Sequence, residues 1–163
     1  MSFNKKLKKY SLIETSELGM VFWSFLYFFT LLASYFILRP LRDEMGIVNG
    51  ASNMQWLFTG TFIAMLAIIP VFGYLTTKLK IGTVLTFSYV FFMLHIACFY
   101  YLFKMQWYMD ILPVFFFIWL SVFNLFVVSL FWSFMVDIFS IDQSKRLFGI
   151  ISVGGSLGAL LGP

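Results

Sequence analysis

Four long apolar runs with almost no charged residues fill most of this 163-residue chain. A helix that crosses the hydrocarbon core of a bilayer needs about 20 apolar residues, so each run is long enough to span a membrane. The runs are continuous rather than alternating, which favours helices over the strands of a membrane barrel. They cover residues 21–38, 54–75, 83–103 and 111–139, and a fifth segment covers residues 147–163. The sequence therefore predicts an all-α, polytopic membrane bundle.

The composition supports this fold class and argues against several others. Hydrophobic residues make up 61% of the chain and charged residues 11%, far from the average of soluble domains. The motifs of metalloproteases, nucleophile-elbow hydrolases, P-loop enzymes and dinucleotide-binding folds do not occur, so neither an enzyme nor a cofactor is expected. His95 and Cys98 are three residues apart, but two ligands seldom hold a metal, so no metal site is predicted.

Loop charges predict the orientation of the helices. Lys and Arg are enriched in cytoplasmic segments, and here the excess lies on the side of the N-terminus. We therefore expect a multi-pass protein of the cell (inner) membrane. A cytoplasmic basic segment would cover residues 1–18, and a transmembrane domain residues 19–163. The inner side carries Lys5, Lys6, Lys8, Lys9, Lys78, Lys80, Lys145 and Arg146, and the outer side carries Arg39, Arg42 and Lys104. The net charge of +4 is attributed to this bias, and no nucleic acid partner is expected.

A pair of arginines closes the first apolar run on the outer side. Pro40 disfavours helical geometry at Arg39, so the helix is expected to kink or stop there. A guanidinium pair at a broken helix end can bind a carboxylate or a phosphate in bidentate fashion. The alternative is an ordinary interfacial arrangement, in which Arg39 and Arg42 pair locally with Asp43 and Glu44.

Polar residues inside the apolar runs are candidates for lining a solute pathway. One strip shares a single face of the first helix and consists of Ser24, Tyr27, Thr30 and Ser34. The alternative is that its hydroxyls bond to their own backbone and Tyr27 packs. Asn124 lies near the middle of the fourth run, where an amide usually forms hydrogen bonds across helices, and this structural role is favoured.

An acidic residue, Asp137, lies near the inner end of the fourth run. A carboxylate at that depth normally has a cationic partner, which Lys145, Arg146 or Lys78 could supply. We interpret this pairing as a structural or gating latch in preference to a proton site, and Asp137 is also a candidate for lining the solute pathway.

Glycines recur every four residues in the fifth segment. Gly154, Gly158 and Gly162 therefore share one face, which lets another helix approach closely. Because glycine lowers helix propensity, this face is expected to pack against a partner rather than lipid.

Two short blocks of the chain combine charged, aromatic and small residues. The first is the sequence ILRPLRD over residues 37–43. The second consists of FWSF at residues 131–134 followed by DQSKRLFG at residues 142–149. Both blocks resemble motifs of the ATP/ADP translocases of plastids and intracellular bacteria. The chain departs from the family pattern at Pro40, which replaces an acidic residue, and at Arg42, which replaces a lysine. These translocases are similar in architecture to the major facilitator superfamily, a twelve-helix fold of two six-helix halves.

The resemblance implies roles for residues of both blocks. By position, Arg39, Arg42 and Asp43 become candidate substrate or gate residues. Lys145 and Arg146 become candidates for an inner gate or for phosphate contacts.

These predictions converge on one function. The chain is expected to be the N-terminal part of a major-facilitator-like secondary transporter, an antiporter of nucleotides or similar organic anions that works by alternating access. Its partners would be the lipid bilayer, a small anionic solute and the remaining helices of the full-length transporter. Without those remaining helices, the chain is not expected to transport. The alternative is a small multi-pass scaffold or complex subunit with no transport activity. An intramembrane enzyme ranks far behind both.

Overall fold

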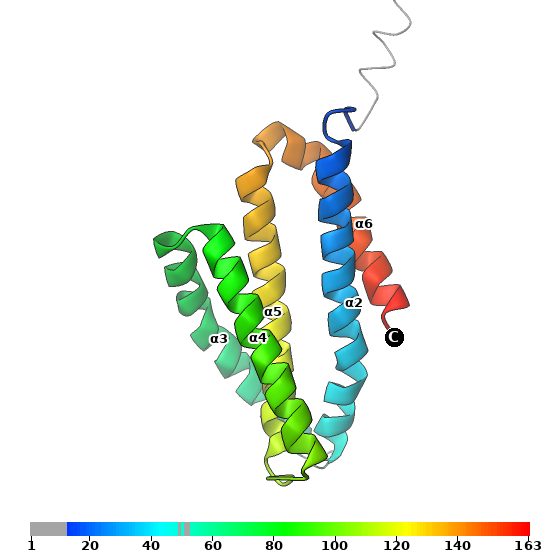
Figure 1. Ribbon diagram of the computed structural model, residues 1–163. Helices are drawn as coiled ribbons and strands as arrows, with labels where there is room; N and C mark the ends of the chain where they lie inside the picture. Colours follow the sequence, from blue (N-terminus) through cyan, green and yellow to red (C-terminus); the bar gives the residue numbers. More distant parts are fainter. Residues whose placement is uncertain (1–12, 49, 51–52) are drawn as a thin grey trace, which may run out of the picture. The chain divides into compact units, whose positions relative to one another are not determined.

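The computed structural model describes residues 13–48, 50 and 53–163, and these form five helices and no strand. The helices are α2 (Leu18–Val48), α3 (Met54–Lys78), α4 (Ile81–Lys104), α5 (Leu112–Ile138) and α6 (Ile141–Leu161) (Figure 1). The first four are long and apolar enough to cross a membrane. The predicted all-α, polytopic fold class is therefore confirmed. The basic residues Lys5, Lys6, Lys8 and Lys9 lie outside the described residues.

Helix α2 is longer than the first apolar run. It continues through Pro40 to Val48, so of the two expected outcomes the stop at this proline is wrong, whereas a kink there stays a prediction. Proline removes a single backbone hydrogen bond from a helix, and neighbouring helices can compensate for that loss in a membrane protein. The turns beyond Pro40 have such neighbours, because a Cβ atom built on Gly46 would lie 3.0 Å from the ring of Phe117 and 3.8 Å from Leu57. The packing of these turns against neighbouring helices thus outweighs the local preference of Pro40 against a helix.

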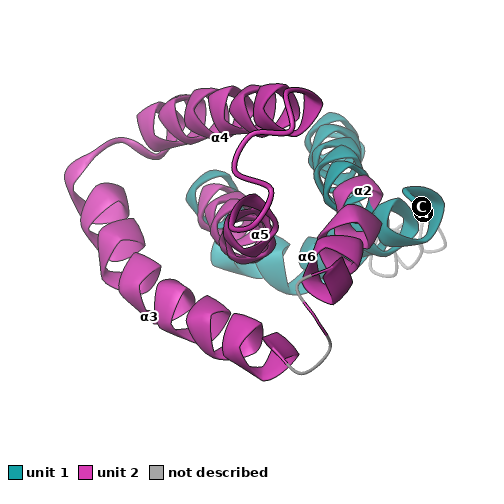
Figure 2. Ribbon diagram, turned by 90° about the horizontal axis from the view of Figure 1, so that it is seen from below, with its two compact units in different colours: residues 1–36, 135–163 teal, residues 37–134 magenta. Residues whose placement is uncertain are grey.

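The chain divides into two compact units, which are described separately. Unit 1 contains Met1–Phe36 and Met135–Pro163, and unit 2 contains Ile37–Phe134 (Figure 2).

In unit 1 the glycine face of α6 lies against the backbone of α2. The glycines face carbonyl oxygens that are also four residues apart: Gly154 faces Phe25, Gly158 faces Phe29, and Gly162 faces Ala33. A Cβ atom built on Gly154 would lie 2.5 Å from the oxygen of Phe25, and one built on Gly162 would lie 2.7 Å from that of Ala33. Only residues without a side chain permit this approach, so the stripe sets the distance between the two helices.

In unit 2 helix α5 occupies the interior. Figure 2 shows it enclosed by α3, α4 and the last turns of α2. Half of the most apolar stretch of α5 is buried, compared with 11% for α3 and 17% for α4, so the two outer helices present most of their apolar side chains outward. Aromatic rings fill the space between α4 and α5, with Phe92 and Phe123 4.9 Å apart and Phe99 and Trp119 5.1 Å apart. Outward apolar side chains are what a hydrocarbon solvent requires.

Candidate functional site

The guanidinium of Arg42 is held inside unit 2 by contacts from two helices. Its Nε and Nη2 atoms both donate to Oδ1 of Asp43, at 3.0 and 2.6 Å. Nη1 donates to the hydroxyl of Ser121 on α5 at 3.4 Å, and the guanidinium carbon lies 5.0 Å from the ring centre of Phe117. The side chain is 16% exposed. A cation stacked on an aromatic face and bonded to a hydroxyl is fixed in position, so Arg42 is a structured part of the unit.

Arg39 approaches the same carboxylate from the other side. Its Nε lies 3.9 Å from Oδ2 of Asp43, and its side chain is 47% exposed. Asp43 therefore stands between two guanidinium groups, with one carboxylate oxygen toward each. The local pairing that the sequence offered as an alternative is formed with Asp43, whereas Glu44 makes no salt bridge within the described ranges.

Helix register places further polar groups at the level of Arg42. Gly46 packs near Leu57 and Phe117, and α2 runs antiparallel to α3 and α5 (Figure 1). One helical turn further in the same direction, Gly46 is followed by Arg42 on α2, Leu57 by Thr61 on α3, and Phe117 by Ser121 on α5. Arg42, Thr61 and Ser121 therefore lie at one level.

Buried polar atoms without a partner also lie in unit 2. In the part of the chain that the structure describes, these atoms are Oγ1 of Thr61, Nε1 of Trp119 and Oδ1 of Asn124. The carbonyl oxygen of Asn124 therefore accepts no hydrogen bond from another described helix, contrary to the structural role that the sequence favoured. An unpaired buried polar group costs about 1–3 kcal/mol, so such groups favour any solute or conformation that offers them a partner.

Unit 1 contains a second charged cluster, centred on Glu17. Oε1 of Glu17 accepts from Nη2 of Arg146 at 2.9 Å and from Nε2 of Gln143 at 3.0 Å. Oε2 accepts from the backbone N–H of Glu14 at 3.0 Å. The side chain is 5% exposed. These contacts lower the pKa of Glu17 below its ordinary value of 4.5, the backbone N–H of Glu14 contributing most, then the amide of Gln143, then Arg146.

The start of α6 is ordered by a capping box. The backbone N–H of Gln143 donates to the hydroxyl of Ser140 at 3.4 Å, and the backbone N–H of Ser140 donates to the side chain of Gln143 at 3.0 Å. Because Gln143 also contacts Glu17, the cap and the charged cluster share one residue.

The predicted latch at Asp137 is not formed with either cation of α6. Arg146 pairs with Glu17, and Lys145 lies 3.9 Å from Asp142 in an exposed pair. Asp137 is itself exposed and makes no salt bridge with another described residue of its unit. Sequence reasoning did not select Glu17 as a site residue, although an acidic residue directly before an apolar run was a usable signal.

Two hydroxyls of the polar strip of α2, those of Thr30 and Ser34, form hydrogen bonds to the backbone of their own helix. The hydroxyl of Thr30 donates to the carbonyl oxygens of Leu26 and Tyr27, both at 3.0 Å, and that of Ser34 donates to the oxygen of Thr30 at 2.7 Å. Both side chains are exposed, whereas Ser24 is buried. The backbone alternative thus describes Thr30 and Ser34, and a role of the strip in a solute pathway stays a prediction.

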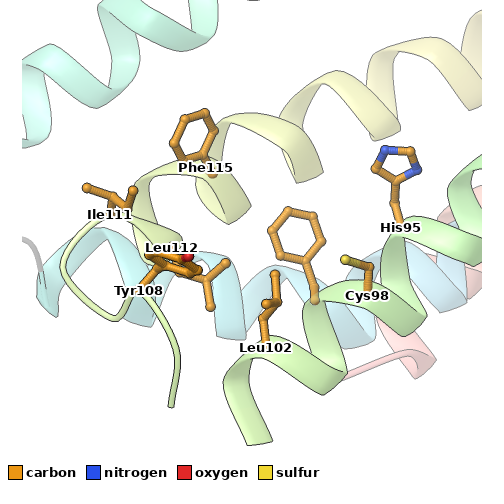
Figure 3. Close-up of a pocket in the computed structure, with 8 residues that line it drawn as sticks. His95, Cys98, Leu102, Tyr108, Ile111, Leu112 and Phe115 are labelled. Carbon is orange, nitrogen blue, oxygen red and sulfur yellow. The ribbon is translucent and has the colours of Figure 1, made fainter. Parts of the chain in front are cut away.

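His95 and Cys98 lie in an apolar cavity of about 280 Å³ (Figure 3). Its walls come from α4, α5 and the segment between them, and consist of His95, Cys98, Phe99, Leu102, Tyr108, Ile111, Leu112 and Phe115. Nδ1 of His95 lies 2.8 Å from the carbonyl oxygen of Phe91. A local backbone contact therefore occupies this nitrogen, and the cavity presents no charged carboxylate or guanidinium to a solute.

Comparison with known proteins gives one match. The sequence model of the Major Facilitator Superfamily matches residues 3–163. No curated protein and no solved structure matches the chain. Members of this superfamily are membrane transporters rather than enzymes. The match covers nearly the whole sequence, and four helices of the described residues are long and apolar enough to cross a membrane. The chain therefore belongs to the Major Facilitator Superfamily and is a multi-pass membrane protein.

Proposed function

We propose that this chain is the N-terminal part of an antiporter that exchanges nucleotides or similar organic anions by alternating access. The observation that carries the proposal is the position of Arg42. An interfacial arginine without a special role extends toward water, yet the Arg42 side chain is 16% exposed while that of Arg39, three residues earlier, is 47% exposed.

The charge and geometry of this cluster suit an anion. Two guanidinium groups and one carboxylate carry one net positive charge. Arg42 presents a planar fork of donors beside the hydroxyl of Ser121, and such a fork matches the oxygens of a phosphate or a carboxylate. The apolar ring of Phe117 and the surrounding bilayer weaken competition from water, which strengthens an electrostatic contact. Nucleotides are the class that the resemblance of residues 37–43 suggests.

The cluster at Glu17 is assigned to the inner gate. This assignment follows the proposed orientation, in which the N-terminus and the first turn of α6 are cytoplasmic in the cell (inner) membrane. The Glu17–Arg146 contact would then hold α2 and α6 together at the inner side of unit 1. Lys145, whose side chain is 73% exposed, is more accessible to a phosphate there than Arg146, which is 34% exposed. Ser24, Tyr27, Thr30, Ser34, Asn124 and Asp137 stay candidates for lining the pathway.

Binding of labelled ATP to the protein in lipid nanodiscs tests the proposed site. A hydrogen bond to a charged group contributes about 1.5–3 kcal/mol, so Arg42→Gln should weaken ATP binding about tenfold or more. Lys104→Gln removes the same charge from the same predicted side and should leave the affinity unchanged. Equal affinities for the two variants would refute the role of Arg42. Absence of ATP binding by the wild-type protein would favour the scaffold alternative.

A further inference from the structure

We infer that Asp43 is a built-in competitor of the transported anion, occupying the site that a phosphate or carboxylate of the solute would take on the two arginines. This inference rests on the proposed function of Arg42. It adds a role for Asp43 that differs from both substrate contact and simple gate residue, because the carboxylate would set how tightly the site holds an anion.

The contacts of Asp43 are those expected for a bound anion. Its Oδ1 accepts two hydrogen bonds from Arg42, and its Oδ2 lies 3.9 Å from Nε of Arg39. Each oxygen of the carboxylate thus faces a different guanidinium. A ligand phosphate has enough oxygens to make the same contacts, and both groups cannot occupy this space together.

Helix geometry makes this pairing unusual. Residues next to each other in a helix point in different directions, so Arg42 and Asp43 do not meet through their positions alone. Arg42 is instead held by Phe117 and Ser121 of α5, and Asp43 reaches the guanidinium from the exposed side. The Asp43 side chain is 51% exposed, so it can turn away into the aqueous boundary when a solute arrives.

The magnitude follows from the exposure of Asp43, whose side chain is 51% exposed although that of Arg42 is 16% exposed. Ion pairs with a solvent-exposed carboxylate contribute about 0.2–1 kcal/mol, which converts to a change of about 1.4- to fivefold in a dissociation constant. Removing the carboxylate charge should therefore tighten anion binding by up to about fivefold, and added salt should reduce the difference because such contacts are screened.

The test measures binding of inorganic phosphate and of ATP to the protein in nanodiscs. Asp43→Asn keeps the shape of the side chain and should lower both dissociation constants. Glu44→Gln is the matched control, since it removes one negative charge from the next residue, which makes no salt bridge within the described ranges. It should leave both constants unchanged. Arg42→Gln in combination with Asp43→Asn should abolish the gain.

The outcomes separate this inference from the proposed function. If Arg42→Gln weakens ATP binding but Asp43→Asn and Glu44→Gln have the same dissociation constants for both anions, Arg42 keeps its role. The inference that Asp43 competes with the anion is then overturned. If neither wild type nor Asp43→Asn binds either anion, the inference is overturned as well. The near-ultraviolet circular dichroism of each variant shows whether the tertiary packing of the aromatic side chains is retained. An Asp43→Asn protein with native dichroism and unchanged affinity is therefore a clear refutation.

Discussion

The glycine face of α6 gives the sharpest test of how the helices of unit 1 pack. The substitution is Gly154→Ala, which adds a single methyl group where α6 meets α2. That methyl carbon would lie 2.5 Å from the carbonyl oxygen of Phe25, whereas ordinary contact begins at 3.4 Å. The backbone atom cannot rotate away as a side chain would, so the helices must separate locally by about 0.9 Å, the difference between these two distances.

The energetic consequence can be bounded. A gap of about 0.5–1 Å forfeits about a quarter to a half of the dispersion energy of each contact along the seam. Overpacking of this kind costs about 1–3 kcal/mol. Gly149→Ala is the matched control in the same helix, because its added methyl group meets nothing within 4 Å. Alanine is the better helix former, so this control should be neutral or stabilise the protein by up to about 1 kcal/mol.

Thermal unfolding of both variants in detergent measures the difference. We expect Gly154→Ala to unfold at a lower temperature than wild type, and Gly149→Ala at the same temperature or a higher one. If the two alanine variants were equally stable, the close approach of α6 to α2 would not describe the folded protein, and the packing argument would be refuted.

Two further predictions concern the first turn of α6. The pKa of Glu17 is lowered in the folded protein, so its contacts stabilise the fold above the unfolded value near 4.5 and are lost as pH falls through the lowered folded value. Thermal stability measured from pH 7 to pH 3 should therefore show an acidic loss that Glu17→Gln removes, and an identical pH profile for the variant would contradict the assignment. Ser140→Ala removes the helix cap and should cost about 0.5–2 kcal/mol of unfolding free energy, whereas Ser152→Ala, which loses only a hydroxyl bonded within its own helix, should cost less. Chemical denaturation compares the two serine variants, and equal losses would show that the cap contributes nothing.

The sequence predicted the fold class because the signal is one of length and polarity. A continuous apolar run of about 20 residues has few structural solutions in a bilayer, so the four spans could be read directly. The extent of α2 could not be predicted in this way. Pro40 carries a strong local preference against helix, and only the packing of Gly46 near α3 and α5 reveals that the helix continues. A prediction from local sequence preference fails where contacts between helices determine how far a helix extends.

The candidate site was predictable in its residue types but not in its partners. Arg39 and Arg42 were chosen as a cationic pair at the end of a span, and Asp43 became a candidate through the resemblance of residues 37–43. Their arrangement depends on Ser121, which is 79 residues away from Arg42 in the sequence, and no local pattern connects the two. In the same way Arg146 was one of three cations proposed as a partner of Asp137, yet it pairs with Glu17, 129 residues away.

The prediction that further helices are needed for transport has its own test. The purified chain alone, reconstituted in liposomes loaded with ATP, should take up no labelled ATP above background. Exchange by the purified chain would show that no additional helices are required.

The most direct measurement of the central claim is ATP counterflow in membrane vesicles from cells that produce the full-length transporter of which this chain is the proposed N-terminal part. Vesicles loaded with ATP should accumulate labelled ATP from outside. This accumulation should fall to background with Arg42→Gln and stay near the wild-type rate with Lys104→Gln. Equal rates for both variants, or no accumulation by the wild-type protein, would contradict an anion antiporter that works through Arg42.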